Sequence, residues 1–490
     1  MPTIFGARMR RHAADPRAPV AIAMPGREIT YAELLRQVEA CAAWLVREGC
    51  QPSELVGLTI ADEVTHLVAS LALLELGIPQ VCLATHDPAP MRLRLAERLS
   101  VARILVADAQ HRLDGIATLA LTPDVLRALP YDGLPYPVGD DPDATACYFT
   151  SSGTTGVPKV IALSQSLMLR RAERLGECQS FAPDERVLMA VSVENYPAKT
   201  TRLYCLCLGV TSVLQGTPSA SAPSLLDLCS SLNVTSLELT VLQALGIVQD
   251  SAGKEQVPAR AKVFVGGSRV PATLRDSLRA RVGPQVFVNY GAQEVWRMAS
   301  TYPNDPEPGR ESVGPPLPWI ELEIVDGEGA RLPHGEVGEV RVRSECMIHE
   351  YHGDPVATSR HFRGGWFHPG DLGSLTPGGS LCIHGRSDDM MNLNSIKIFP
   401  AEIERVLEAH PAVKAAAAFA IPSAIHGGIP AAAVELHASA QVSVEDLMAR
   451  ARARLGVRAP RKIVVLEALP RSAAGKIAKN DLIALVVPRK

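Results

Sequence analysis

Residues 148–160 read Tyr148-Phe-Thr-Ser-Ser-Gly-Thr-Thr-Gly-Val-Pro-Lys-Val160. Two glycines, Gly153 and Gly156, stand among five Ser and Thr residues, and Lys159 follows a proline. The preceding residues 144–149 predict a short buried strand, so the polar stretch is predicted to be the loop that leaves this strand. The backbone N–H groups, hydroxyls and single ammonium of such a loop can bind a polyphosphate.

This stretch is not a Walker A loop. In that motif four residues separate the first glycine from Gly-Lys-Ser/Thr, whereas Lys159 follows Pro158 and precedes Val160. A single Gly/Ser/Thr run is more often a flexible polar loop than a ligand site. Its interpretation therefore depends on the other motifs of the chain.

The composition restricts the class of protein. The chain has 490 residues, of which 47% are hydrophobic, enough for roughly three domain-sized units. The 49 basic and 52 acidic residues give a net charge of −3, which does not favour nucleic acid or an anionic membrane as partner. The ten cysteines show no CxxC spacing, so reduced thiols and a cytoplasmic location are predicted.

No stretch predicts a membrane span. The best apolar run, 67–83, is interrupted by Glu75, Gly77 and Pro79. The N-terminus has no uninterrupted apolar segment ending in a cleavage site, so we expect no signal peptide.

Strand and helix patterns alternate along the first part of the chain. A helix over 28–49 is predicted to begin at Thr30, with Glu33 completing a capping box. The other predicted elements are a helix over 63–76 and strands at 56–60, 80–84, 104–106, 187–193, 211–214, 263–265 and 286–289. This alternation predicts an α/β architecture with largely parallel sheets.

After about residue 313 the pattern changes. Residues 320–325 and 337–342 alternate apolar and polar side chains, as in an antiparallel subdomain. From Pro400 onward a compact α+β region is predicted. Its elements are a helix from 400, strands at 415–421, 431–436 and 463–466, and a helix over 444–455.

Two acidic residues follow predicted strands or turns. Residues 286–294 form a strand running into Asn289-Tyr-Gly-Ala-Gln-Glu294, where a carboxylate can share a hard cation with phosphate oxygens. Residues 366–371, Trp-Phe-His-Pro-Gly-Asp, end in a carboxylate that can accept two O–H donors from a vicinal diol. Each alone would be an ordinary strand end or turn.

Two further stretches lie in the last quarter of the chain. The first is Gly385-Arg-Ser-Asp-Asp-Met-Met-Asn-Leu-Asn-Ser-Ile-Lys-Ile-Phe-Pro-Ala-Glu-Ile-Glu404. The second is Leu469-Pro-Arg-Ser-Ala-Ala-Gly-Lys-Ile477. Taken singly, they would be a charged linker and a solvated tail.

In this order the stretches resemble the motifs of the acyl-adenylate-forming enzymes, which include acyl-CoA synthetases, nonribosomal-peptide adenylation domains and luciferases. Segments at 29–34, 265–268, 334–339 and 350–353 also resemble this family, so the matches run from about residue 29 to 477. The resemblance implies an α/β fold with a large N-terminal domain (1–385) of layered sheets plus a β-rich subdomain. A small, mobile α+β C-terminal domain (386–490) follows.

The resemblance also implies roles for individual residues. Lys476 is the catalytic lysine facing the reacting carboxylate and the α-phosphate, and Glu294 is the catalytic magnesium ligand. Asp371 holds the ribose hydroxyls, and Arg386 contacts ribose or phosphate. The other implied ATP or AMP contacts are Thr150, Ser151, Ser152, Gly153, Thr154, Thr155, Gly156, Lys159, Gly267, Ser268, Asn289, Tyr290, Gly291 and Gln293.

The implied hinge is Asp388, and Ser395 and Lys397 belong to the loop used in the thiol step. Three positions depart from the family pattern: Gln293 and Pro369 replace Thr, and Ser395 replaces Gly. The family's glycine lies beside the pantetheine path, so Ser395 puts a standard thiol tunnel in doubt. Residues 378–381, Gly-Gly-Ser-Leu, look like a carrier-protein site but are interpreted as a hairpin turn.

The acyl pocket is predicted to include Tyr196, Gly266, Gly291, Ala292 and Trp296. Acetate-type members have a bulky residue where Gly291 stands, which indicates a pocket larger than acetate needs. Trp296 could narrow that pocket or belong to the core, and both alternatives stay open.

Residues 192–199 contain no Asp, unlike amino-acid-activating members, and ammonium binding by Glu194 is the weaker alternative. A simple organic or fatty acid is therefore the leading substrate.

The predicted activity is ATP- and Mg²⁺-dependent formation of acyl-AMP, followed by transfer to coenzyme A. The alternatives are delivery to a separate acyl- or peptidyl-carrier protein, release of acyl-AMP itself, and a non-catalytic nucleotide- or acyl-binding homologue. Neither nucleic acid nor a membrane span is expected.

Overall fold

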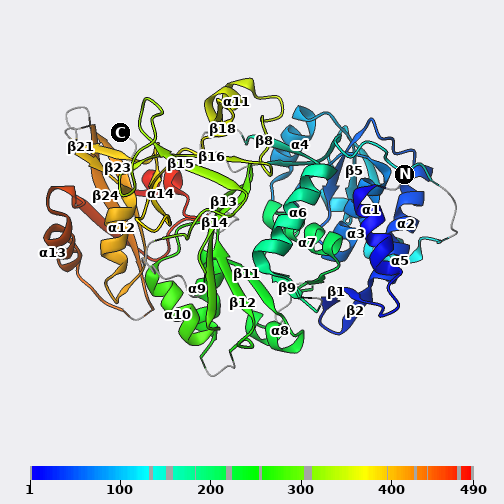
Figure 1. The fold of residues 1–490 in the computed structure, drawn as a ribbon, viewed down its shortest axis with the longest axis horizontal. Coiled ribbons are helices and arrows are strands. Elements are labelled where there is room, and N and C mark those ends of the chain that lie inside the picture. Colours follow the sequence, from blue (N-terminus) through cyan, green and yellow to red (C-terminus); the bar gives the residue numbers. More distant parts are fainter. Residues whose placement is uncertain are drawn as a thin grey trace.

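The computed structural model describes residues 3–131, 136–150, 158–182, 184–216, 223–252, 256–302, 312–393, 396–423, 427–438, 440–471 and 476–486. Within these residues the strands form four sheets, called here the N-terminal, central, β-rich and C-terminal sheets. The C-terminal sheet lies at the opposite end of the molecule from the N-terminus, with β13, β14 and β16 between the two ends (Figure 1).

The N-terminal sheet has the strand order β6-β5-β3-β4-β7-β8. All its pairs are parallel except β7–β8. Its strands are β3 (Leu55–Thr59), β4 (Gln80–Cys82), β5 (Val101–Val106), β6 (Ala117–Ala120), β7 (Thr145–Thr150) and β8 (Val160–Ser164). The strand predicted before the Gly/Ser/Thr run is therefore confirmed as β7.

The central sheet has the order β14-β13-β12-β11-β9-β10-β1-β2. Its inner pairs are parallel, and only the edge strands β14 and β2 run antiparallel to their neighbours. The strands are β1 (Val20–Met24), β2 (Arg27–Thr30), β9 (Arg186–Met189), β10 (Thr211–Val213), β11 (Ser236–Thr240), β12 (Lys262–Gly266), β13 (Gln285–Ala292) and β14 (Trp296–Ser300).

One apolar core joins these two sheets through shared helices. The helices in it are α1 (Ile4–Ala13), α2 (Tyr31–Arg47), α3 (Glu63–Leu76), α5 (Pro123–Ala128), α6 (Gln165–Gln179) and α7 (Tyr196–Leu208). Every residue of α3 after Glu63 is buried, as expected for a helix that is apolar on all sides. The predicted capping box of α2 is confirmed: Thr30 Oγ1 accepts from the Glu33 N–H, and the Glu33 carboxylate accepts from the Thr30 N–H.

Other helices cover the outer faces of the two sheets. On the N-terminal sheet this is α4 (Ala89–Arg98). On the central sheet they are α8 (Leu225–Ser231), α9 (Val241–Asp250) and α10 (Ala272–Arg281).

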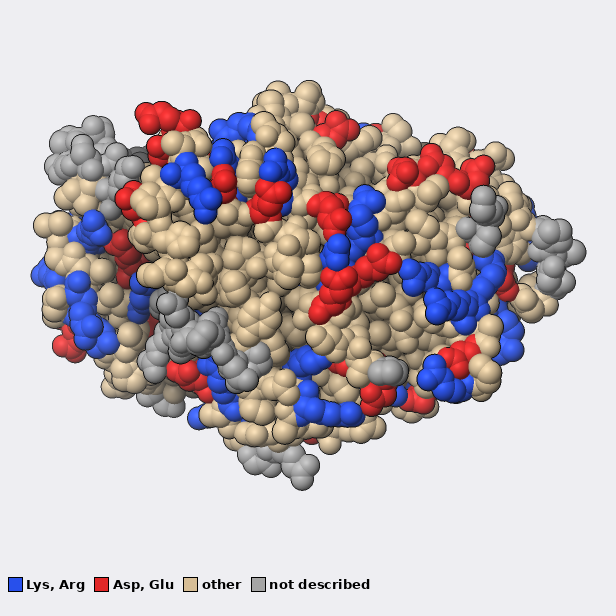
Figure 2. All heavy atoms as spheres, in the orientation of Figure 1, with Lys and Arg blue, Asp and Glu red and all other residues tan. Residues whose placement is uncertain are grey.

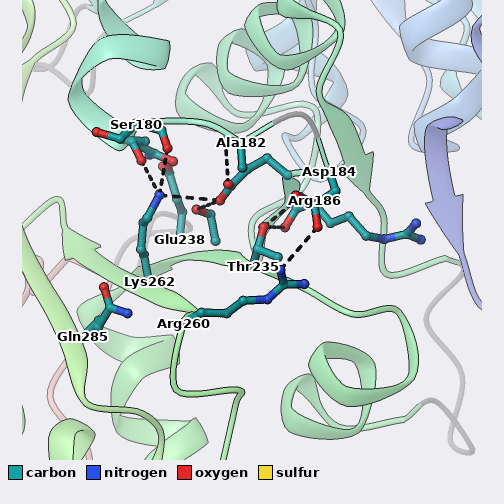
Figure 3. Close-up of polar contacts among 12 residues, drawn as sticks. Ser180, Ala182, Asp184, Arg186, Thr235, Glu238, Arg260, Lys262 and Gln285 are labelled. Atoms are coloured by element: carbon teal, nitrogen blue, oxygen red, sulfur yellow. Dashed lines mark hydrogen bonds and ion pairs between the residues drawn. The ribbon is translucent and has the colours of Figure 1, made fainter. Parts of the chain in front are cut away.

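Polar contacts join the amino-terminal ends of β9, β11 and β12 (Figure 3). The Lys262 ammonium donates to the Ser180 carbonyl at 3.3 Å, just after α6. The Arg186 N–H donates to Thr235 Oγ1 at 2.8 Å. These contacts hold the amino-terminal ends of the strands in the central sheet. The motif residues lie at the carboxyl ends of the strands, where ligands bind in open α/β sheets.

The β-rich sheet is antiparallel and built around β16 (Gly338–Ser344). Its other strands are β15 (Ile320–Val325), β17 (Phe362–Arg363), β18 (Trp366–Phe367), β19 (Asp371–Leu375) and β20 (Leu381–Arg386), and α11 (Pro355–His361) precedes β17. Residues 376–380 form the turn between β19 and β20, which confirms the hairpin predicted there.

The C-terminal sheet contains β21 (Met391–Leu393), β22 (Ile396–Ile398), β23 (Val413–Ser423), β24 (Gly427–Leu436) and β25 (Lys462–Leu466). On one face pack α12 (Pro400–Glu408) and α13 (Val444–Leu455), and on the other α14 (Lys479–Val486). The predicted α+β character of this region and the bounds of α13 are confirmed.

Some predicted elements were wrong in extent. The strand expected over 187–193 ends at Met189, because the following loop is held elsewhere: Glu194 accepts hydrogen bonds from Thr85. The strand expected over 286–289 continues to Ala292, since the Tyr-Gly-Ala residues pair with β14. No individual bounds were predicted for the helices α1, α4–α11 and α14, or for the strands β1, β2, β6, β8, β11, β14 and β17–β22.

Acidic and basic side chains are interspersed on the face shown in Figure 2, in line with the small net charge. In the described ranges, none of the helices has the length and apolar character needed to span a bilayer.

Candidate active site

The turn between β13 and β14 holds Glu294 in a buried position. Its carboxylate accepts a hydrogen bond from the Tyr351 hydroxyl at 2.6 Å. Its carbonyl accepts from the Ile348 N–H at 2.8 Å. Burial and the neighbouring Glu294 charge raise the pKa of Tyr351, so this hydroxyl stays protonated as the donor.

Arg171 of α6 holds the backbone of this turn. Its guanidinium donates to the carbonyls of Gln293 at 3.1 Å and Glu294 at 3.0 Å. It also donates to the Cys346 carbonyl at 2.9 Å and the Tyr196 hydroxyl at 2.7 Å. Arg171 is fully buried, and these four acceptors are neutral, so the side chain acts as a structural brace.

A second group of contacts surrounds Lys159, which follows the Gly/Ser/Thr run. Its Nζ lies 2.8 Å from Nε2 of His361 and 4.9 Å from the centre of the Tyr351 ring. Burial lowers the pKa of Lys159, and the Glu294 carboxylate opposes that shift. Lys159, Tyr351 and Glu294 thus lie in one connected cluster.

Asp371 and Arg386 are opposite residues on β19 and β20. The guanidinium lies 3.4 Å from Asp371 Oδ1, while Oδ2 accepts from the Tyr290 hydroxyl at 2.5 Å. Gly370 has φ +81°, and a Cβ there would lie 2.9 Å from an Arg386 guanidinium nitrogen. Glycine at this position therefore lets Arg386 reach the acidic residue.

Arg386 also contacts the predicted hinge. Its Nε lies 3.2 Å from Oδ1 of Asp388, which is exposed. The hydrogen bonds of Arg386 therefore extend from Asp371 to the first residues after β20.

Lys476 reaches the same cluster from the C-terminal region. Desolvation lowers its pKa, the carboxylates of Asp371 and Glu294 oppose the shift, and Arg386 adds to it. The residue keeps an exposed surface, while the surrounding protein desolvates its ammonium among these charges. The structure thus brings together Lys476, Asp371, Arg386 and Glu294, residues spread over most of the second half of the chain.

The remaining predicted nucleotide-binding and thiol-step residues lie at strand ends or outside the described residues. Thr150 ends β7. The exposed Gly267 and Ser268 follow β12, and Asn289 Oδ1 accepts from the Ser300 hydroxyl at 2.8 Å. Ser151, Ser152, Gly153, Thr154, Thr155, Gly156 and Ser395 lie outside the described residues, and Lys397 is described only as part of the backbone of β22.

The residues predicted to line the acyl pocket lie near the end of β13, on more than one element. Tyr196 packs edge-on against Phe149, with ring centres 4.9 Å apart, and its hydroxyl lies 3.3 Å from the Gln293 carbonyl. At Gly266 a Cβ would lie 2.9 Å from the Asn289 carbonyl oxygen. Ala292 ends β13 beside this region.

Two residues used to argue pocket size have structural explanations. A Cβ at Gly291 would lie 2.2 Å from the Trp296 carbonyl oxygen, so strand pairing already requires glycine there. Trp296 is buried in the core against Trp319, with ring centres 6.5 Å apart, which supports the core alternative. Neither residue therefore indicates the size of the acid.

Glu194 is also engaged structurally. Both of its carboxylate oxygens accept from Thr85, each at 2.7 Å. These bonds support the view that ammonium binding there is the weaker alternative.

Glu294 is a suitable ligand for Mg²⁺. Among the described residues no group of three or more His, Cys, Asp and Glu side chains could hold a metal ion. Mg²⁺, however, is commonly bound by one or two carboxylates together with substrate phosphates. One buried carboxylate beside a predicted phosphate loop fits that requirement.

Arg171, Tyr351 and His361 were not predicted as site residues. Arg171 interrupts an apolar stripe of α6 formed by Leu167, Met168 and Leu175, which is a detectable signal. That signal does not reveal the three carbonyl acceptors, which lie more than a hundred residues away in sequence.

This fold and the convergence of these residues define an AMP-forming ligase. The family model described as AMP-binding enzyme matches residues 9–352, and the model described as AMP-binding enzyme C-terminal domain matches residues 402–476. The chain belongs to the AMP-binding enzyme family. The predicted family and fold class are thereby confirmed, as is acyl-adenylate activation.

Individual relatives differ in the names they carry. Enterobactin synthase component E of Escherichia coli is 27% identical over 97% of this chain and 92% of its own length. A 2-succinylbenzoate–CoA ligase of Geobacillus kaustophilus is 27% identical over 95% of each chain. The solved amide bond synthetase McbA of Marinactinospora thermotolerans is 25% identical, covers 99% of this chain and 100% of its own, and superposes with a TM-score of 0.87.

Proposed function

We propose that the protein is an acid–thiol ligase that converts a carboxylic acid and ATP to acyl-AMP and pyrophosphate, then transfers the acyl group to coenzyme A. The observation that carries this proposal is the position of Lys476 among Asp371, Arg386 and Glu294. A cation placed between nucleotide-binding and metal-binding carboxylates suits the adenylation step.

In the first step a carboxylate oxygen of the acid attacks the α-phosphorus, and the bond to the β-phosphate oxygen breaks. Asp371, supported by the Tyr290 hydroxyl, would accept hydrogen bonds from the ribose. Lys159 and the 150–156 loop would bind the departing phosphates, and Lys476 would stabilise charge on the forming bond. When bound, a Mg²⁺ ion held by Glu294 would neutralise part of the phosphate charge.

The second step requires Lys476 to give way to the thiol. We place the domain boundary at 385/386, so that residues 386–490 turn about Asp388. This motion would withdraw Lys476 and bring residues 388–397, with Ser395 and Lys397, toward the adenylate. The thiol sulfur then attacks the acyl carbon, and AMP leaves.

Three acceptors for the acyl group are compatible with the chain, and coenzyme A is the first. The 2-succinylbenzoate–CoA ligase is named for coenzyme A, which supports that thiol. Ser395, which replaces a glycine beside the pantetheine path of similar enzymes, favours a carrier protein as the second candidate. An enzyme that stops at acyl-AMP is a third.

The test is pyrophosphate release with ATP and Mg²⁺ from a panel of aliphatic, aryl and amino acids, each with and without coenzyme A. We expect release with a simple organic or fatty acid, strongly accelerated by coenzyme A. Release indifferent to coenzyme A would contradict that acceptor and direct attention to carrier proteins and to Ser395→Gly. Absence of nucleotide-dependent turnover across the panel would instead favour a non-catalytic role.

A further inference from the structure

His361 presents a specific acceptor to Lys159. It is the last residue of α11, is buried, and its Nδ1 lies 2.8 Å from the His368 carbonyl. A carbonyl can only accept, so Nδ1 carries the proton in this bond. In the neutral ring Nε2 is then unprotonated and accepts from the Lys159 ammonium at 2.8 Å.

The surroundings favour the neutral ring. Burial lowers the pKa of His361, and the charges of Lys159 and Arg360 act in the same direction. The hydrogen bond to the His368 carbonyl and the Glu294 charge oppose them, and the net shift is downward. A second proton would place two cations in contact. The short distance and the His368 carbonyl therefore describe a fixed tautomer with its lone pair directed at Lys159.

The same contact orients Lys159 relative to the rest of the cluster. The ammonium lies over the Tyr351 ring, and the Tyr351 hydroxyl is bound to Glu294. His361 packs edge-on against Tyr351, with ring centres 5.8 Å apart. A lysine side chain has four rotatable bonds, so fixing its end reduces the freedom it would lose on binding phosphate.

We propose that His361 is a positioning residue that holds the Lys159 ammonium, through its Nε2 lone pair, in the orientation that receives the β- and γ-phosphates of ATP. This inference rests on the proposed function only in taking ATP as the ligand; it involves neither the acid nor the acceptor.

A purely structural role is the competing explanation. His361 also stacks with Phe367, with ring centres 6.3 Å apart, so its removal could disturb the β-rich sheet. Two substitutions separate the roles. His361→Phe keeps a ring for packing and loses the acceptor, whereas His361→Gln keeps a side-chain oxygen of similar reach as acceptor.

The experiment measures binding of a non-hydrolysable ATP analogue and of AMP to the full chain with Mg²⁺, by calorimetry, alongside thermal unfolding. We expect His361→Phe to weaken binding of the ATP analogue roughly ten-fold, the usual scale for a lost charge-assisted contact, and to leave AMP binding unchanged. We expect His361→Gln to recover most of the affinity. In a Lys159→Met background, His361→Phe should have no further effect.

Equal loss of ATP-analogue and AMP binding would overturn the proposal in favour of a structural role, as would unchanged ATP-analogue binding in His361→Phe. An additive effect in the Lys159→Met background would overturn it too. If wild type bound the analogue but released no pyrophosphate with any acid, the proposed function would fail while this test stood.

Discussion

The two parts of the candidate site are built in contrasting ways. Glu294 and Asp371 lie on strands and turns of the N-terminal region. Glu294 is held by the buried Arg171 and Tyr351, and Asp371 by the partly buried Tyr290. Lys476 is exposed and lies on a segment between β25 and α14. The difference indicates that substitutions on the braced part should affect folding and activity together, whereas changes at Lys476 should affect activity alone.

The N-terminal and C-terminal regions contact each other through rings and through charged side chains. The rings of His384 and Phe399 lie with their centres 6.0 Å apart. Arg269, after β12, pairs with Glu408 of α12 and lies 3.8 Å from Glu404. Burial raises the pKa of Glu408, and the Arg269 charge opposes that shift. A contact of this kind can stabilise one orientation of the C-terminal region without making it permanent.

The largest effect is expected at Lys476. Lys476→Ala should reduce pyrophosphate release by about a hundred- to a thousand-fold, the scale for losing one oriented charge-stabilising donor. The free energy of unfolding should not change, because the side chain is exposed. Thioester formation from supplied acyl-AMP should be retained, and equal loss of both reactions would refute the division of labour between the steps.

Arg171 tests the braced part. Arg171→Met removes four hydrogen bonds around the Glu294 turn, although the Ile348 N–H still donates to the Glu294 carbonyl and the Tyr196 hydroxyl to the Gln293 carbonyl. We expect about 3 kcal/mol loss in the free energy of unfolding, together with lower activity. Urea unfolding measures the change in the free energy of unfolding. The matched control is Arg170→Met, because Arg170 is the exposed neighbour of Arg171. A loss no larger than that of the control would contradict the assigned brace.

Tyr351 connects the brace to the metal ligand. Tyr351→Phe removes the hydroxyl that donates to Glu294, so we expect roughly ten-fold slower adenylation and a higher Mg²⁺ requirement. Magnesium titrations of pyrophosphate release measure both effects, and the exposed Tyr302→Phe is the control. An unchanged Mg²⁺ requirement in Tyr351→Phe would contradict a role of the Tyr351 hydroxyl in metal binding.

Arg269→Ala should have a smaller and selective effect. Losing a partly exposed ion pair should slow adenylation by about two- to five-fold and leave the thioester step unchanged. Arg279→Ala is the control, because Arg279 pairs with Asp276 within α10. Equal slowing of both steps would mean that the pair does not favour the adenylating orientation.

The pH dependence should show the mildest change. Because the pKa of Lys476 is lowered, its charge is lost at a lower pH than that of an ordinary lysine, so adenylation should decline as pH rises through that lowered value. The decline should lie below pH 10.5, the usual lysine value. Lys476→Arg should move it to higher pH, and a profile identical to wild type would assign the decline to another group.

The sequence predicted what local patterns determine. The capping box at Thr30 and the bounds of α13 follow from nearby residues, and both are confirmed. The order of Lys159, Glu294, Asp371, Arg386 and Lys476 was predicted through the motif resemblance. Their roles in the reaction remain predictions.

The supporting residues could not be predicted in the same way. His361 is 202 positions from Lys159, and Tyr351 is 57 positions from Glu294, so only the folded chain brings them together. Gly291 and Trp296 show the converse limit, since a residue that suits a pocket can equally be required by strand pairing or core packing.

The pairing of Asp371 with Arg386 across one hairpin has a consequence for the lifetime of the intermediate. Asp371 lies before the proposed domain boundary, and Arg386 is the first residue after it, close to the pivot at Asp388. Asp371 would therefore not travel with the lysine. The contact between Asp371 and the nucleotide would then persist after the Lys476 ammonium has left the site. A water-sensitive mixed anhydride would stay anchored during the interval between its formation and its use, and the hairpin would limit its escape.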